Sequence, residues 1–202
     1  MTEQRSRPRL GANLSVKNEA HRILRQHLEN LREFCDEIVV SVDEGSTDNT
    51  LAICRELADT VFTIPAGDYS GMIRQAGRER MQAEWELWVD ADFIFPQQLQ
   101  AEIRQAIGTG THDCYEVPMV SLFFGKWFLS DRYKGHHLRL MHRNRVSYHR
   151  NDLHNWEFEY RGTCGVLKWP VLHYAFRDIA DFVDKANWYT SLDVPRLVSV
   201  GK

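Results

Sequence analysis

Short apolar segments alternate with longer helical patterns over residues 10–107, and this alternation restricts the possible folds more than any other feature of the chain. The predicted strands either alternate in polarity or form short apolar runs; they are LGANLSV (10–16), EIVVSV (37–42), TVFTI (60–64) and ELWVD (86–90). Apolar residues at three- and four-residue spacings predict helices over 23–34, 51–58, 70–83 and 96–107. Strands that alternate with helices predict an α/β fold with a mostly parallel sheet covered on both faces.

Beyond residue 110 the pattern changes to a region rich in aromatic residues, arginine and histidine. Three segments there are predicted to form strands, namely CYEVPMVSLFF (114–124), HHLRLMH (136–142) and GVLKWPVLHYAF (165–176), and a last helix is predicted over 179–189. With 202 residues and 43% hydrophobic content, the chain can bury one substantial core. We therefore expect a single domain over 1–202, with residues 10–107 and 110–202 as its two halves.

Charge and composition exclude several function classes. A net charge of −3 and a pI near 6.3 argue against general nucleic-acid binding, which requires a basic excess. The four cysteines are widely spaced and suggest reduced thiols rather than a zinc or redox motif. The N-terminal residues are polar, and no apolar run has the length of a membrane span. These features predict a cytoplasmic protein and leave contact with the inner face of the cytoplasmic membrane open.

Two aspartates, Asp90 and Asp92, follow an apolar run in the segment WVDADFIF (88–95). Side chains two residues apart on a strand point the same way, so both carboxylates can converge on one cation. Oxygen ligands of this kind suit Mg²⁺ or Mn²⁺. The alternative is a pair of solvated loop aspartates, with Asp92 near the start of the next helix.

A second acidic segment begins at Asp43, where another buried strand ends. A turn that caps the next helix through Asp48 explains the segment GSTD (45–48) equally well. It does not explain two acidic strand ends in the same half of one sheet. Ligands of parallel α/β sheets gather at the carboxyl ends of the strands, so a site is predicted there.

Four segments resemble those of family-2 glycosyltransferases in order and approximate spacing. They are VKNEA (16–20), DEIVVSVDEGSTDNT (36–50), RQAGRERMQAEWELWVDAD (74–92) and HY (173–174). The chain is similar in particular to the small enzymes that add sugars to the inner core of lipopolysaccharide. The resemblance covers residues 10 to about 190 and is far more specific than the two aspartates alone.

The resemblance implies a GT-A fold, a nucleotide-sugar donor, hexosyl or heptosyl transfer with inversion, a divalent metal and a saccharide or glycolipid acceptor. Residues 10–107 would then be the nucleotide-sugar-binding half and residues 110–202 the acceptor side. The residue assignments that it carries over are Asp43 at the base, Arg74 at the base or diphosphate, Glu19 on the nucleotide side, Asp90 at the ribose or metal, and Asp92 and His173 at the metal.

The general base is where the chain departs from the family. The family usually has a His-Glu pair before the last strands, with the glutamate as base, whereas this chain has His154 followed by Asn155. An amide cannot accept the proton of the acceptor hydroxyl. Asp152 and Glu157 are the nearest catalytic candidates. Glu159, His154 and a catalytically impaired protein that only binds nucleotide sugars remain as alternatives.

Two segments of the second half are candidates for acceptor binding. Trp127 can stack on a sugar ring, although aromatic runs more often build core. Arg139 and Arg143 share one register and can jointly face the donor or an anionic acceptor, or they can lie on a solvated basic face. The helix over 179–189 can either pack on the domain or lie on a membrane surface.

Overall fold

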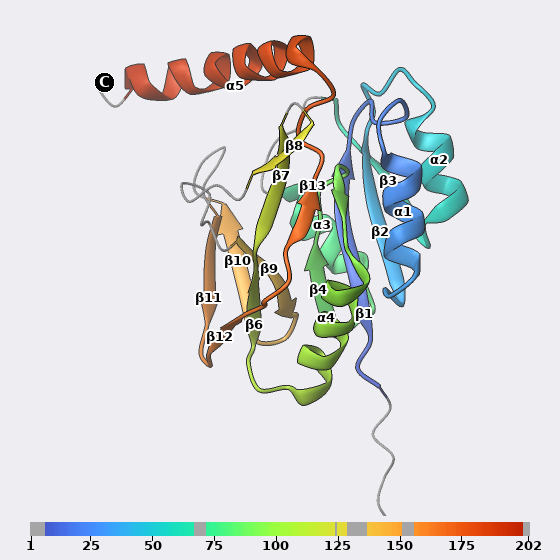
Figure 1. Cartoon of the computed structure of the whole chain (residues 1–202), viewed down its shortest axis with the longest axis vertical. Coiled ribbons are helices and arrows are strands. Elements are labelled where there is room, and N and C mark those ends of the chain that lie inside the picture. The colour runs from blue at the N-terminus through green and yellow to red at the C-terminus, as the bar shows by residue number, and fades with distance from the viewer. Residues whose placement is uncertain (1–6, 67–71, 124, 129–136, 151–155, 200–202) are drawn as a thin grey trace, which may run out of the picture.

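A seven-stranded sheet in the order β12-β6-β9-β4-β1-β2-β3 is the centre of the computed structural model, which describes residues 7–66, 72–123, 125–128, 137–150 and 156–199 (Figure 1). Its strands are β1 (Leu10–Val16), β2 (Glu37–Asp43), β3 (Thr60–Ile64), β4 (Trp85–Trp88), β6 (Cys114–Val117), β9 (His137–His142) and β12 (Cys164–Val166). The pairs β4-β1, β1-β2, β2-β3 and β12-β6 are parallel, whereas β9 runs antiparallel to both β4 and β6. The predicted mostly parallel sheet is therefore confirmed.

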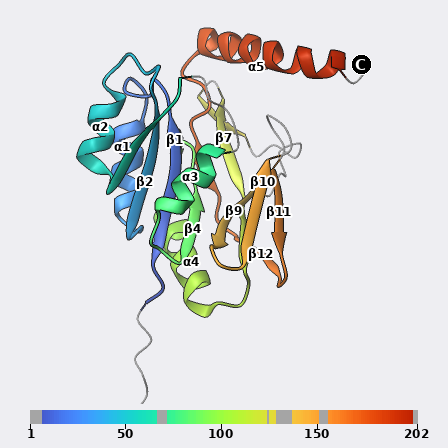
Figure 2. The ribbon, with the colours of Figure 1, turned by 180° about the vertical axis from the view of Figure 1, so that it is seen from behind.

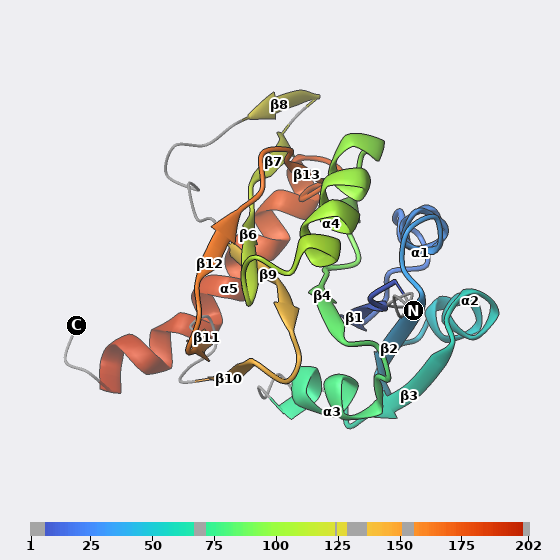
Figure 3. The same ribbon diagram turned by 90° about the horizontal axis from the view of Figure 1, so that it is seen from below.

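Helices cover both faces of this sheet, as predicted (Figure 3). The helices α1 (Leu24–Arg32), α2 (Thr50–Leu57) and α4 (Gln97–Thr109) pack on the face that carries the main apolar core. Helix α3 (Met72–Arg80) and the antiparallel hairpin of β10 (Val146–Arg150) and β11 (Trp156–Tyr160) lie on the opposite face. In β1, alternate side chains serve the two sides: Leu10, Ala12 and Leu14 are buried in the main core, and Asn13 faces α3.

The predicted elements of the first half are confirmed, with shifted ends. Strand β4 ends at Trp88, two residues earlier than predicted, so Asp90 lies in the loop that follows it. Helix α3 ends at Arg80 rather than residue 83, because Glu37 accepts the backbone N–H groups of Gln82 and Ala83 beyond the helix. Helix α4 begins after Pro96 and is capped at its C-terminus by Gly110, whose φ of +60° is the left-handed conformation that favours glycine.

A smaller four-stranded sheet joins the two halves of the chain. Its strands, in spatial order, are β5 (Phe93–Ile94), β13 (Val171–His173), β7 (Met119–Phe123) and β8 (Lys126–Phe128). Strand β13 is antiparallel to β5 and parallel to β7, with His173 paired to Phe93. This register brings the late histidine beside the loop that contains Asp92.

The last helix, α5 (Ile179–Ser199), begins at the predicted residue and continues ten residues beyond the predicted end. It crosses the end of the molecule at which the parallel strands finish (Figures 1 and 2). Its first turns are held by an aromatic cluster in which Phe182 contacts Phe123 and Phe176, with ring centroids 5.5 and 5.0 Å apart. Among the described residues, no helix has both the length and the apolar character needed to cross a membrane.

Helix α1 contains a fully buried histidine, His27. Its Nδ1 lies 2.5 Å from the carbonyl oxygen of Phe93, and because a carbonyl only accepts, Nδ1 carries a proton. Its Nε2 has no hydrogen-bond partner among the described residues. Burial lowers the pKa of His27 to about 4. The folded protein therefore resists protonation of this ring.

We expect acid to destabilise the protein through His27. The unfolded chain takes up the proton near pH 6.5, so the free energy of unfolding should fall by roughly 3 kcal/mol between pH 6.5 and 4 on this account alone. In His27→Asn, the amide keeps a donor for the Phe93 carbonyl and does not titrate. Urea unfolding of both proteins across this pH range should give a shallower pH dependence for the variant. Equal slopes would contradict the prediction.

Candidate active site

The loops after β1 and β2 are tied together by polar contacts. The carboxylate of Asp48 accepts hydrogen bonds from the backbone N–H of Thr50 at 3.0 Å and of Ala20 at 3.0 Å. The Thr50 hydroxyl in turn accepts from the backbone N–H of Glu19 at 2.8 Å. Asp48, the predicted cap, lies one residue before the observed N-cap, Asn49, but still accepts the first N–H of α2. It also fixes the loop after β1. Glu19 is held by this arrangement.

Asp43 ends β2 and is buried, with 4% of its surface exposed. Its Oδ1 accepts the backbone N–H of Gly45 at 2.7 Å, and its Oδ2 lies 3.4 Å from Nζ of Lys17. A Cβ at Gly45 would lie 2.9 Å from the same Oδ1, so this close approach requires glycine. The carboxylate is therefore held rigidly at the strand end.

Asp90 lies between two arginines from different elements. Its Oδ1 accepts from Nη2 of Arg74 on α3 at 2.7 Å, and its Oδ2 accepts from Nη1 of Arg139 on β9 at 2.9 Å. Arg74 also donates through Nη1 to the backbone carbonyls of Asn13 and Val89. Burial alone would raise the pKa of the Asp90 carboxyl, but the Arg139 and Arg74 guanidiniums lower it well below its usual range. Asp90 is therefore ionised, with both oxygens paired.

Asp92 has a different environment. Its Oδ2 lies 3.4 Å from Nε2 of His173 and 4.0 Å from Nζ of Lys185, whereas its buried Oδ1 has no hydrogen-bond partner among the described residues. The Nδ1 of His173 lies 3.0 Å from the Ser121 hydroxyl, which orients Nε2 toward Asp92. The carboxylate thus keeps one oxygen available for a ligand.

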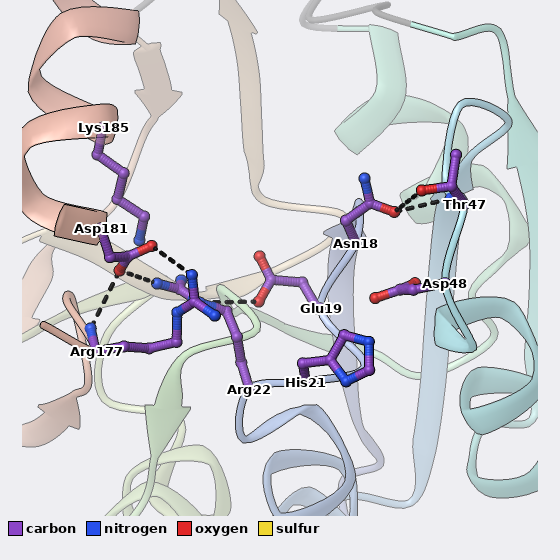
Figure 4. Close-up of a pocket in the computed structure, with 9 residues that line it drawn as sticks. All are labelled: Asn18, Glu19, His21, Arg22, Thr47, Asp48, Arg177, Asp181 and Lys185. Atoms are coloured by element: carbon purple, nitrogen blue, oxygen red, sulfur yellow. Dashed lines mark hydrogen bonds and ion pairs between the residues drawn. The ribbon is translucent and has the colours of Figure 1, made fainter.

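A pocket of about 540 Å³ lies next to this region, and Lys185, whose Nζ is 4.0 Å from Asp92, is one of the residues that line it (Figure 4). Its walls are the loop after β1 (18–22), the loop after β2 (47–48) and the start of α5 (177–185). Glu19 points into it, and burial raises the pKa of this carboxyl to about 7. The Asp181 carboxylate on α5 accepts from the Arg22 guanidinium, which also lies 3.9 Å from Oε2 of Glu19. The pocket is therefore lined by charges of both signs.

Comparison with known proteins places this chain in a family. The chain matches the family described as glycosyl transferase family 2 over residues 14–169. It belongs to glycosyl transferase family 2. An uncharacterized glycosyltransferase of Rickettsia felis is 27% identical over 206 residues, covering 96% of this chain and 72% of the relative. One from Rickettsia typhi is also 27% identical, covering 93% of this chain and 67% of the relative.

The solved structures include a similar fold at lower sequence identity. TarS 1–349 of S. aureus in complex with UDP superposes with a TM-score of 0.50 and 20% identity, covering 62% of this chain and 39% of that chain. At this identity the likeness concerns the fold alone. The chain thus spans about two fifths of the TarS fragment, and the expected GT-A fold is confirmed.

The side chains of this family-2 glycosyltransferase that can ligate a metal fit a divalent cation at one position. Asp92 and His173 supply an oxygen and a nitrogen ligand, and the unpartnered Oδ1 of Asp92 is the kind of atom that a cation satisfies. Among the described residues, no group of three or more ligating side chains converges. A site with two protein ligands is nevertheless usual for Mg²⁺ when substrate phosphates complete the coordination. Asp90, which is paired to two arginines, fits this position less well.

The remaining predicted site residues lie in several places. Trp127 on β8 is 44% exposed and meets Tyr174 edge-on, with ring centroids 5.4 Å apart. Glu157 is exposed on β11, in the hairpin on the α3 side of the sheet, and Asp152 lies outside the described residues. The suggestion that Arg143 acts together with Arg139 is wrong, because Arg143 donates to the carbonyl of Arg78 in the last turn of α3 and to that of Ala83 beyond the helix.

Sequence reasoning missed three residues at this site. Arg22, Asp181 and Lys185 are brought together only by the position of α5, and no local motif marks them. Their one signal in the sequence is that Asp181 and Lys185 lie four residues apart and so share a face of a predicted helix. This face turns toward the site.

Proposed function

We propose that this chain transfers a sugar from a nucleotide-sugar donor to a hydroxyl of a saccharide or lipid-linked saccharide, with inversion at the anomeric carbon. The observation that carries the proposal is that Asp43 and Asp90 lie at the carboxyl ends of β2 and β4, which only β1 separates in the sheet, with the Asp92–His173 pair next to Asp90. A buried carboxylate at a strand end suits the hydrogen-bond donors of a nucleobase or ribose, and a cation site suits a diphosphate. We place the reaction in cell-envelope glycan synthesis, at the cytoplasmic side of the membrane.

Each group has a proposed role. Asp43 and Glu19 bind the nucleoside, and Arg74 with Asp90 forms the floor beneath it. Asp92 and His173 hold Mg²⁺ or Mn²⁺, which when bound neutralises charge on the leaving diphosphate. Arg139, which contacts Asp90 and lies with its guanidinium carbon 5.0 Å from the Phe93 ring centre, and Trp127 are assigned to the acceptor side.

The proton of the acceptor hydroxyl requires a base on the face opposite the leaving group. Asp152 and Glu157 remain the proposed candidates. A nucleotide-sugar-binding protein without transfer is the second candidate function, because position 155 carries an amide where the family usually has a glutamate. Only turnover distinguishes the two.

A donor screen tests the proposal. The purified chain is incubated with UDP-, GDP- and ADP-linked sugars and Mg²⁺ or Mn²⁺, and release of the nucleoside diphosphate is measured with and without a chelator. We expect release or transfer from one donor class only with metal, and NMR of the product should show the inverted anomer. A thermal shift with one donor but no turnover with any tested acceptor would favour the binding protein. No shift and no turnover would overturn both.

A further inference from the structure

Lys185 enters the site from an element that is far away in sequence. It lies on the second turn of α5, three residues after Phe182 and four after Asp181, so these side chains share one face of the helix. Phe182 is fixed by the aromatic cluster with Phe123 and Phe176, and Asp181 is fixed by Arg22. Two independent contacts therefore dock this face and hold Lys185 over Asp92.

The ammonium group of Lys185 is only partly committed to protein partners. It donates to the backbone carbonyl of Ala175 at 2.7 Å, and it lies 4.0 Å from Oδ2 of Asp92. An ammonium carries three N–H donors, and 4.0 Å is too long for a hydrogen bond. The side chain is 29% exposed and forms the α5 wall of the pocket. The ammonium of Lys185 therefore has N–H groups left to donate to a ligand in the pocket, which is large enough to hold one.

The neighbouring cation has a different function. Arg22 is 10% exposed and is paired with Asp181 on one side and Glu19 on the other, so its charge is already balanced (Figure 4). Arg22 links α5 to the loop after β1. Lys185 and Asp92 form a looser pair at 4.0 Å, so an anion can attract the ammonium without breaking a hydrogen bond to Asp92.

We propose that Lys185 binds the diphosphate of the donor, and that its ammonium exchanges its contact with Asp92 for a phosphate oxygen when the donor enters. This inference rests on the proposed function and adds a phosphate-binding residue from α5 to it. When the bond between the anomeric carbon and the diphosphate oxygen breaks, the electron pair stays on that oxygen and the diphosphate gains one negative charge. A cation held by a rigid helix at this point stabilises that charge.

Binding measurements with charge variants test the inference without requiring turnover. Calorimetry with inorganic pyrophosphate, UDP, GDP and ADP, and with the parent nucleosides, is compared for the wild type, Lys185→Met, Lys185→Arg and Lys168→Met. Lys168 is a matched control, since its ammonium lies over the Trp169 ring and outside the pocket. We expect Lys185→Met to weaken pyrophosphate and nucleoside diphosphate binding about 10- to 100-fold while nucleoside affinity is unchanged.

The other variants give the remaining outcomes. Lys185→Arg should retain most of the diphosphate affinity, and Lys168→Met should match the wild type. Unchanged diphosphate affinity in Lys185→Met, an equal loss for nucleosides, or no binding of pyrophosphate and diphosphates by the wild type would each overturn the inference. Lys185-dependent diphosphate binding without sugar transfer would support it while removing the proposed function. Transfer with no dependence of diphosphate affinity on Lys185 would do the reverse.

Discussion

Asp92→Asn is expected to lower kcat/KM for sugar transfer by at least about 1,000-fold, which corresponds to roughly 4 kcal/mol of transition-state stabilisation. The reason lies in the two oxygens of Asp92: one lies 3.4 Å from the His173 ring, and the other is buried without a partner among the described residues. An amide keeps the shape of the side chain but removes the negative charge that holds a cation. Transfer rates at a series of donor and Mn²⁺ concentrations measure the effect.

Asp184→Asn is the matched control, because Asp184 is exposed on α5 beside Lys185. We expect its kcat/KM to stay within about twofold of the wild type. The ligand-free Asp92→Asn protein should melt at the same temperature as the wild type or higher, since the change removes a buried charge that lacks full compensation. A variant that retains a tenth or more of the activity would rule out Asp92 as the essential ligand.

The second large effect concerns stability. Gly77 lies on α3 against β1, where an added Cβ would be 2.2 Å from Oδ1 of Asn13. Asn13 cannot move away easily, because its Nδ2 donates to the Arg74 carbonyl at 2.9 Å and to the buried Glu86 carboxylate at 2.7 Å. We expect Gly77→Ala to lower the free energy of unfolding by about 3 kcal/mol, through overpacking and the lost hydrogen bonds.

Gly108→Ala provides the comparison, since Gly108 also lies in a helix but an added Cβ would meet nothing within 4 Å. There the greater helix propensity of alanine should raise the free energy of unfolding by about 0.5 kcal/mol. Urea denaturation of both variants therefore tests packing against propensity. Stabilisation by Gly77→Ala would show that α3 does not pack on β1 in the way described.

Local pattern was sufficient to predict most elements of the first half. Strand β2 is buried throughout, and its continuous apolar run shows it, while the buried stripe of Leu99, Ile103 and Ile107 follows from helical spacing. The predicted end of β4 is two residues too late, because Val89 continues the apolar run. Val89 lies beyond the end of β4, although its N–H still donates to the carbonyl of Asn13 on β1. The periodicity of apolar residues indicates which side chains are buried. It does not indicate where a strand ends, because that depends on pairing partners elsewhere in the chain.

The partners of the site carboxylates could not be predicted for the same reason. Arg139 is 49 residues from Asp90 in the sequence, and Lys185 is still farther from Asp92. Their contacts depend on the order of strands in the sheet and on the docking of α5, which no local signal encodes. The resemblance to the family supplied Asp43, Asp92 and His173 as candidates, but it did not distinguish the arginine-paired Asp90 from the open Asp92.

The pairing of β4 with β9 and of β5 with β13 also bears on whether the enzyme is modular. A fragment of residues 10–107 would contain Asp43, Asp90 and Asp92 but would lack both Arg139 and His173. It would also leave β4 as an unprotected edge, with the unpaired backbone groups that promote aggregation between chains. Residues 10–107 are therefore not an independent folding unit, and a chimera between relatives would have to exchange β4, β9 and β13 together to keep these pairings.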